Sequence, residues 1–155
     1  MKSNKSTTIW VCATILILAG LFAWPRFNDP NKELKKKIAK AGVECLSDGA
    51  EFAQHIHSHL VIKINGKGVE VPADIGIIRG CEYELHTHDA TGIIHVESPR
   101  GNKAFTLGQF FTVWDRPLEQ KGYALKATAD KKSLENPKNI ILKDEQEILL
   151  EYIEK

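Results

Sequence analysis

The sequence contains little sulfur. Met1 is its only methionine, and its three cysteines form no Cys-x-x-Cys pair. Copper(I) shuttles depend on soft thioether and thiolate ligands, so this scarcity argues against a protein of that class. The formal net charge is only +1, which gives no sign of a nucleic-acid or acidic-polymer partner. No repeat, low-complexity tract, Ser-His-Asp set or Cys-His nucleophile pair stands out.

Histidine is absent from most of the chain and concentrated in one part of it. The six histidines are His55, His57 and His59 in the string HIHSHL, and His86, His88 and His95 in the string HTHDATGIIH. Neutral imidazole is the commonest protein ligand for zinc, copper, nickel and iron. Alternate residues of an extended strand share a face, so the histidines of each string would project together. The pattern predicts a transition-metal site made of these six residues.

An apolar run precedes the histidines and extends from Ile9 to Trp24. It has no polar face, is slightly shorter than the ~20 residues that span a bilayer as a helix, and is followed by no clear cleavage site. We therefore predict a cytoplasmic basic tail at 1–8, an uncleaved transmembrane anchor at 9–24 and a linker or helical stalk at 25–42. The remainder, 43–155, is long enough to bury one core.

Two sequence signals conflict over the side of the membrane on which this domain lies. The lysines and arginine that follow the anchor outnumber the charges before it, which favours a cytoplasmic domain. Long domains translocate largely regardless of charge, however, and Cys45 and Cys81 are an even pair that brackets the first histidine string. We predict a periplasmic or extracellular domain. The two cysteines either form a disulfide or are two buried thiols.

The first histidine string begins a predicted hairpin. In HIHSHLVIKINGKGVEVP, apolar residues alternate with histidines and other residues, and Asn65-Gly66 is the strongest short hairpin signal. This register places Ile62 opposite Val69 on the core face. The histidines then stand on the other face.

A second predicted hairpin pairs YELHTH with IIHVES across the turn at 89–92. It sets His86 opposite His95, with Cβ atoms ~5 Å apart, the spacing that a shared metal ion requires. It also sets Glu84 opposite Glu97 on the same face, where two carboxylates need a cation or a proton between them. Asp89 is assigned to the turn or, like Glu97, to orienting an imidazole.

The remaining elements complete the expected fold. Thr106 and Gln109 form a capping-box pattern that opens a short helix ending before Pro117. Two closing strands follow at 123–128 and 148–153. The sequence therefore predicts an α+β, mostly β class: a small antiparallel domain of two hairpins, one helix and closing strands, with a β-grasp arrangement as one candidate.

Three long stretches also resemble a known pattern. They are HIHSHLVIKINGKGVEVPADIGI, CEYELHTHDATGIIHVESP and FTLGQFFTVWDRPL. Together they are similar to an uncharacterised family of membrane-anchored or secreted bacterial and archaeal domains with the pattern HIHxHL…VNG…VPxxIGI…LHTHDxxGIIHVESP…FTLGQFFxxW. This chain departs little from it, with Ile64 where valine is more usual. The resemblance implies export and a shared histidine site, and it supplies no reaction.

Three functions remain open from the sequence. The first is a membrane-anchored protein that binds Cu(II) or Zn²⁺ and holds it or exchanges it with a donor or acceptor protein. The second is a metalloenzyme with Glu97 or Glu84 as base, and the third is a metal-free interaction module. Within the site we expect His86, His88 and His95 to be joined by His57 or His59. His55, at the end of its strand, is expected to matter less.

Overall fold

A computed structural model describes residues 29–47 and 49–155 of the chain. The predicted anchor at 9–24 and the basic tail at 1–8 lie outside the described residues. None of the described helices is long and apolar enough to cross a membrane. Residues 34–155 form one structural unit, and the candidate site lies within it.

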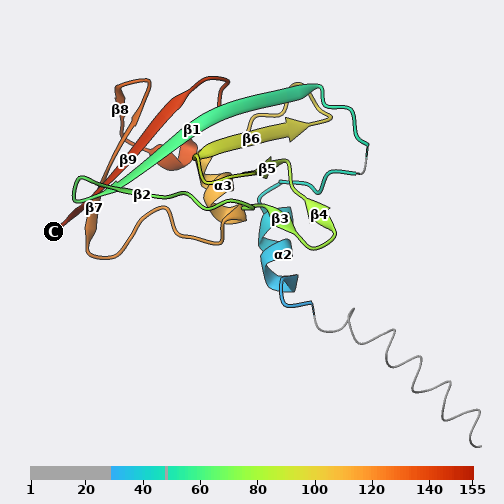
Figure 1. Cartoon of the computed structure of the whole chain (residues 1–155), viewed down its shortest axis with the longest axis horizontal. Helices are drawn as coiled ribbons and strands as arrows, with labels where there is room; N and C mark the ends of the chain where they lie inside the picture. Colours follow the sequence, from blue (N-terminus) through green and yellow to red (C-terminus); the bar gives the residue numbers. More distant parts are fainter. Residues whose placement is uncertain (1–28, 48) are drawn as a thin grey trace, which may run out of the picture. The chain divides into compact units, whose positions relative to one another are not determined.

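The described chain is mostly β, with two α-helices and one 3₁₀ helix (Figure 1). In chain order the elements are α2 (Lys32–Lys40), β1 (Gln54–Ile64), β2 (Lys67–Val69), β3 (Ile77–Ile78), β4 (Cys81–Glu82), β5 (Leu85–His86), β6 (Ile93–Ser98), α3 (Leu107–Val113), β7 (Tyr123–Ala129), β8 (Lys132–Leu134), η1 (Pro137–Asn139) and β9 (Glu147–Glu154). The predicted class, α+β and mostly β, is confirmed.

The main sheet is mixed rather than wholly antiparallel, which corrects the predicted antiparallel domain. Its order is β5-β6-β1-β9-β7-β8, with β2 on β1, while β3 and β4 pair separately. β1 and β9 run parallel, and the other pairs in the main sheet are antiparallel. Hairpin signals are local, so they could not show that the last strand returns beside the first. The β-grasp arrangement stays a prediction.

The first predicted hairpin is confirmed in its turn and register. Asn65 and Gly66 both have positive φ, 49° and 78°, as a type I′ turn requires, and Ile62 pairs with Val69. The core assignment of Val69 is wrong, because this residue is 41% exposed while Ile62 is 5% exposed. β2 lies at the edge of the sheet, and the chain reaches the core only at Val71.

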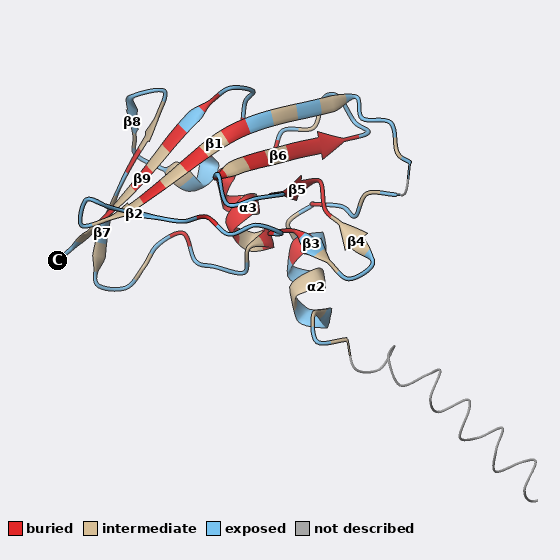
Figure 2. Ribbon diagram, in the orientation of Figure 1, coloured by how far each residue is buried: buried red, intermediate tan, exposed pale blue. Residues whose placement is uncertain are grey.

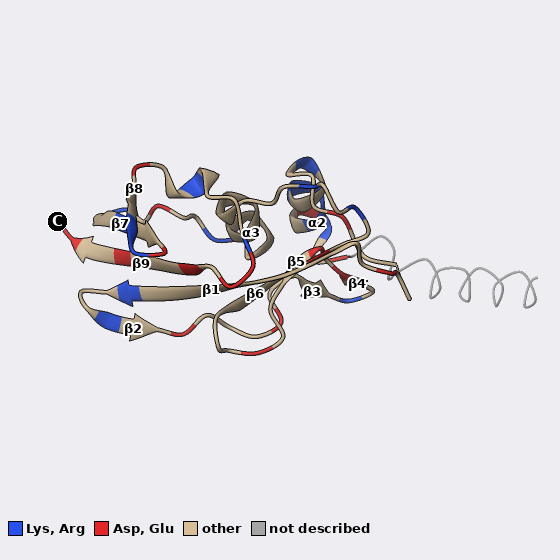
Figure 3. Ribbon diagram, turned by 90° about the horizontal axis from the view of Figure 1, so that it is seen from above, with Lys and Arg blue, Asp and Glu red and all other residues tan. Residues whose placement is uncertain are grey.

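The core lies between one face of the sheet and helix α3. Figure 2 shows buried positions concentrated on β5 and β6 and alternating along β1, and Figure 3 shows α2 and α3 on the same side of β1 and β6. The sheet contributes Leu60, Ile94, Val96, Leu150 and Tyr152, and α3 contributes Leu107, Phe110, Phe111 and Val113. The predicted capping box of α3 is present in both directions between Thr106 and Gln109.

Helix α2 falls in the segment predicted as a linker or stalk. Its Ile38 is fully buried in the core, and Leu34 is partly buried against it. Lys37 forms an exposed ion pair of 2.8 Å with Asp115, just beyond α3. This helix therefore packs as part of the β domain.

The closing strands are confirmed as β7 and β9, but β8 and η1 lie in a segment read from the sequence as a polar loop. β8 returns from β7 through Asp130 and Lys131, both with positive φ. Two adjacent positive φ values at a hairpin turn usually favour Asn-Gly or Asp-Gly. Asp-Lys lacks that glycine, so the sequence carried no clear turn signal here.

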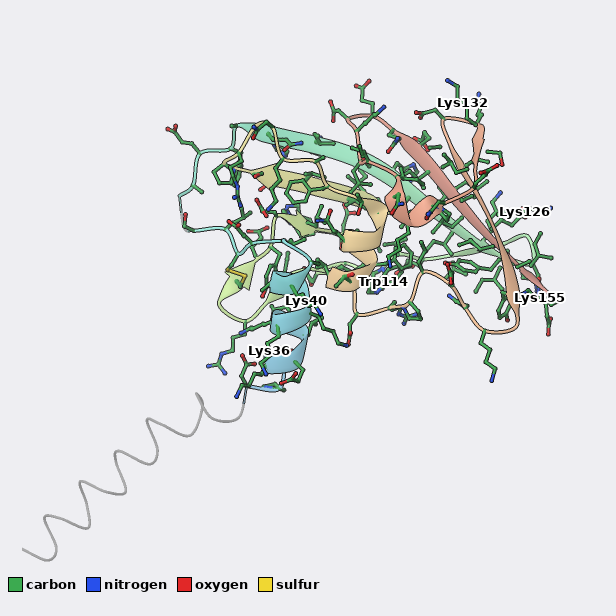
Figure 4. All side chains as sticks on the ribbon, turned by 180° about the vertical axis from the view of Figure 1, so that it is seen from behind. Lys36, Lys40, Trp114, Lys126, Lys132 and Lys155 are labelled. Carbon is green, nitrogen blue, oxygen red and sulfur yellow. A yellow bond between two sulfur atoms is a disulfide. The ribbon has the colours of Figure 1, made fainter. Side chains whose placement is uncertain are left out.

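Cys45 and Cys81 form a disulfide, with their Cα atoms 5.5 Å apart (Figure 4). This resolves the alternative of two buried thiols. The bond joins the segment before β1 to β4, across a sequence separation of 36 residues. A disulfide that closes a loop of that size stabilises the folded state by roughly 3–4 kcal/mol, because it lowers the conformational entropy of the unfolded chain.

Candidate metal centre

A row of histidines crosses three neighbouring strands on one face of the sheet. His57 on β1 pairs with His95 on β6, and His95 pairs with His86 on β5. The predicted pairing of His86 with His95 is confirmed. The alternate residues Ile94 and Val96 are fully buried in the core, so the histidine face is the opposite one.

Four side chains converge at the β5–β6 end of this row. One ligand atom each from His86, His88, His95 and Glu97 lies within 4.8 Å of the others, and we call this group the inner site. The Nε2 atoms of His86 and His88 are 3.1 Å apart. Two nitrogens at 2.0–2.1 Å from a tetrahedral zinc ion would be about 3.3 Å apart, so the spacing fits one shared ion.

His86 is fixed in the orientation that a metal ligand needs. It is fully buried, and its Nδ1 lies 2.8 Å from the carbonyl oxygen of Tyr83, to which it donates a hydrogen bond. Nε2 is then the nitrogen with the free lone pair, and it points at His88. Burial is the main cause that lowers the pKa of His86, so the ring is neutral near pH 7.

His95 lies at the centre of the histidine cluster. Its ring centroid is 4.5 Å from that of His88, 4.8 Å from that of His57 and 5.3 Å from that of His86. Its Nδ1 is buried and makes no hydrogen bond within the described part of the chain. Burial, reinforced by the neighbouring imidazoles, lowers the pKa of His95 to about 4. An ordered nitrogen without a partner, held neutral, is suited to a metal ion.

A second group overlaps the first. Ligand atoms of His55, His57 and His95 also lie within 4.8 Å of one another, and we call this group the outer site. His55, which was predicted as a ligand of lesser importance, lies beside His57 and His95 rather than apart from them. Its ring is 4.6 Å from that of His57, and its Nε2 is 3.2 Å from Oε1 of Glu97, the residue opposite it on β6.

His59 is the predicted ligand that the structure leaves outside both sites. Its Nδ1 is 3.0 Å from Oε2 of Glu147, and its Nε2 is 3.1 Å from the carbonyl oxygen of Thr91. His59 pairs with Ile93, beyond the row that contains His95, and with Glu147 of the parallel strand β9. Both of its ring nitrogens therefore have partners away from the cluster.

Glu84 and Glu97 lie opposite each other in the backbone, as predicted, since the Glu97 amide donates a hydrogen bond of 2.9 Å to the Glu84 carbonyl oxygen, but their carboxylates have different partners. The chain bends at Glu84, and its buried carboxylate accepts hydrogen bonds from the Glu44 amide at 2.8 Å and from the Ser98 hydroxyl at 2.8 Å. It also pairs with the Lys103 ammonium group. Glu84 is thus part of a buried ionic network, whereas Glu97 belongs to the inner site. Only Glu97 remains as a metal-site carboxylate of this pair.

Two further carboxylates flank the histidines. Asp89, predicted for a turn or a supporting role, accepts hydrogen bonds from the Thr91 amide and hydroxyl, and the side-chain bond is the main cause that lowers the pKa of its carboxyl. Its turn role is confirmed. Glu82 was not predicted as part of the site, and its Oε1 lies 3.2 Å from Nε2 of His86 and 3.9 Å from that of His88. Glu82 precedes His86 by four residues, an even spacing that places both on one face of an extended chain, and this was the only signal in the sequence.

An open cleft of about 420 Å³ adjoins the histidine face on the side of β9. Its lining is His57, His59, Thr91, Ile93, Asp144, Glu145 and Glu147. Acidic segments border the start of β9 in Figure 3. The cleft opens beside His57, which belongs to the outer site.

Comparison of the chain with models of protein families, with curated proteins and with solved structures finds no match. The resemblance to the uncharacterised family with the HIHxHL and LHTHDxxGIIHVESP motifs stays a prediction.

The histidine cluster predicts a pH-dependent stability for the metal-free protein. His95 titrates near 6.5 when unfolded but at about 4 when folded, so between these values the unfolded chain binds the additional proton. The free energy of unfolding is therefore largest above pH 6.5 and falls as the pH drops towards 4. Because the ring is partly solvated, we expect a loss of roughly 1–2 kcal/mol.

Urea unfolding with a chelator present, at pH 7 and at pH 4.5, measures this loss. A His95→Asn variant should show a weaker dependence over the same interval, because the carboxyls that titrate there are common to both proteins. Equal slopes in the two proteins would show that His95 does not cause it.

Proposed function

We propose that this protein binds one transition-metal ion, Cu(II) or Zn²⁺, at the inner site. The observation that carries the proposal is the convergence of His86, His88, His95 and Glu97 from β5, β6 and the segment that follows β5. Three imidazoles and one carboxylate are a donor set that both ions accept. The anionic Glu97 also offsets part of the charge of the ion.

The setting of the domain supports metal holding or delivery outside the cytoplasm. The Cys45–Cys81 disulfide is typical of a periplasmic or extracellular protein. The apolar run 9–24 would anchor the domain to the membrane as a single-pass segment, and membership of the uncharacterised family would fit both features. A donor or acceptor protein would then exchange the ion with the exposed histidines. Thiol labelling in intact cells, with Cys45 and Cys81 found free, would contradict the location.

Calorimetric titration tests the metal site. The full chain in mild detergent, with Cys12→Ser so that no free thiol competes, should bind about one Cu(II) or Zn²⁺ tightly at pH 7. Binding should weaken below pH 6 because protons compete for the imidazoles. Binding no tighter than millimolar for both ions would overturn the proposal.

A second candidate, a metal-dependent enzyme, is favoured by the cleft beside the outer site. There His57 lies 3.7 Å from Asp144, and a small molecule would have access to a metal-bound water. Glu97 is the remaining base candidate, since Glu84 is committed to Lys103. Spectroscopy of the Co(II)-substituted protein would separate the two functions, because an exchangeable water ligand is needed for catalysis and not for holding.

The two glutamates predicted as a facing pair should behave oppositely when replaced. Glu97→Gln keeps an oxygen donor but removes its charge, so it should lower metal affinity about 10–100-fold while leaving the free energy of unfolding within ~1 kcal/mol. Glu84→Gln leaves Lys103 without its buried partner and should cost about 2–4 kcal/mol of stability, with metal affinity unchanged. Titration and urea unfolding of both variants measure this contrast. Loss of affinity in Glu84→Gln with normal stability would contradict it.

A further inference from the structure

The inner and outer sites share one residue, His95. It is flanked by His57 on β1 and by His86 on β5, and both groups of ligand atoms include it. We propose that a single metal ion exchanges between the two sites through His95, entering and leaving at the outer site and resting at the inner site. This inference rests on the proposed function, because it requires the inner site to bind an ion.

Exposure distinguishes the two sites. The side chains of His55 and His57 are 51% and 47% exposed, whereas that of His86 is fully buried. An ion at the outer site therefore keeps water ligands and is released readily. The inner site offers four protein donors in a less solvated place, where each electrostatic interaction is stronger. The ion should consequently be captured at the outer site and held at the inner one.

Carboxylates make the outer site favourable for an approaching cation. Glu97 lies 3.2 Å from Nε2 of His55, and Asp144 lies 3.7 Å from Nδ1 of His57. Their negative charge attracts a divalent cation to the outer site. Glu97 also belongs to the inner site. Both Glu97 and His95 can thus stay near the ion while the other ligands are exchanged.

Two ions at once are disfavoured by the shared ligand. A neutral imidazole has one lone pair for a metal, and its second nitrogen carries a proton. Two divalent ions held about 6 Å apart around one ring would also repel each other by roughly 3 kcal/mol even at the dielectric constant of water. The two sites are therefore alternative positions of one ion.

Binding kinetics test the exchange, with Cu(II) alone as the probe and the full chain carrying Cys12→Ser. In a His55→Ala, His57→Ala variant we expect one tightly bound ion and an equilibrium affinity within about 3-fold of the parent. The rate of uptake and the rate of removal by a chelator should both fall by roughly 10-fold, because the ion passes through the outer site in both directions. The ratio of the two rates, which sets the affinity, is then unchanged.

His59→Ala is the matched control, since His59 lies on the same face of β1 and belongs to neither site. Its rates should equal those of the parent. A His86→Gln, His88→Gln variant should keep a weaker Cu(II) site with nitrogen ligands in its electron paramagnetic resonance spectrum, and adding His55→Ala and His57→Ala should abolish it.

Two results would overturn the exchange while leaving the proposed function intact. One is a parent protein that binds two ions tightly. The other is unchanged uptake and removal in the His55→Ala, His57→Ala variant, which would mean that ions reach the inner site directly past the half-exposed His88. A parent protein that binds no Cu(II) would instead refute the proposed function itself.

Discussion

His95→Ala should reduce the affinity for Cu(II) or Zn²⁺ by at least ~100-fold, the largest effect of any single histidine replacement. Replacing residues that merely orient a metal ligand commonly costs 10–100-fold, so removing a ligand should cost more. His95 is also the one histidine common to the inner and outer sites, so no complete site survives its loss. Titration calorimetry against both ions at pH 7 measures the effect.

His59→Ala serves as the control for this loss, because it removes an imidazole from the same face without touching either site. His86→Gln should lose most of the tight binding too, and glutamine fills more of the buried space than alanine would. Circular dichroism should remain native in all three variants. Unchanged affinity in a folded His95→Ala, His86→Gln double variant would show that the β5–β6 end of the row is not the metal site.

Much of the histidine arrangement follows from local sequence signals. The turn at 89–92 fixes the register of its hairpin, so the pairing of His86 with His95 could be worked out by counting outward from the turn. Strand alternation separates the histidine face from the core face of β1 for the same local reason. The capping box of α3 is likewise contained within four residues.

The parts that could not be predicted depend on pairing between distant segments. Whether His57 or His59 meets His95 is decided by the register between β1 and β6, which belong to different hairpins. His59 is instead held by Glu147, on a strand whose parallel return leaves no local signal. Glu82 reaches His86 from the small β3–β4 sheet, and the carboxylate of Glu84 is held by Glu44 and Lys103, which lie outside the hairpin.

Gly76→Ala should destabilise the fold by about 4 kcal/mol and also weaken metal binding. Gly76 has a φ of +78°, and a Cβ there would lie 2.2 Å from the carbonyl oxygen of Leu85, 3.0 Å from Val113 and 3.1 Å from the Cβ of His86. The backbone carbonyl at 2.2 Å cannot move without shifting β5, the strand that carries His86. Urea unfolding and metal titration of the variant measure the two effects.

Gly80→Ala separates this steric cost from the conformational cost of alanine at positive φ. Gly80 has a φ of +77°, nearly that of Gly76, but no atom within 4 Å of the position of a Cβ. Its replacement should therefore cost only about 1 kcal/mol, with metal affinity unchanged. The difference between the two variants is then the cost of pushing the loop at Gly76 away from β5. Equal losses of stability would show that the close approach of this loop does not hold His86 in place.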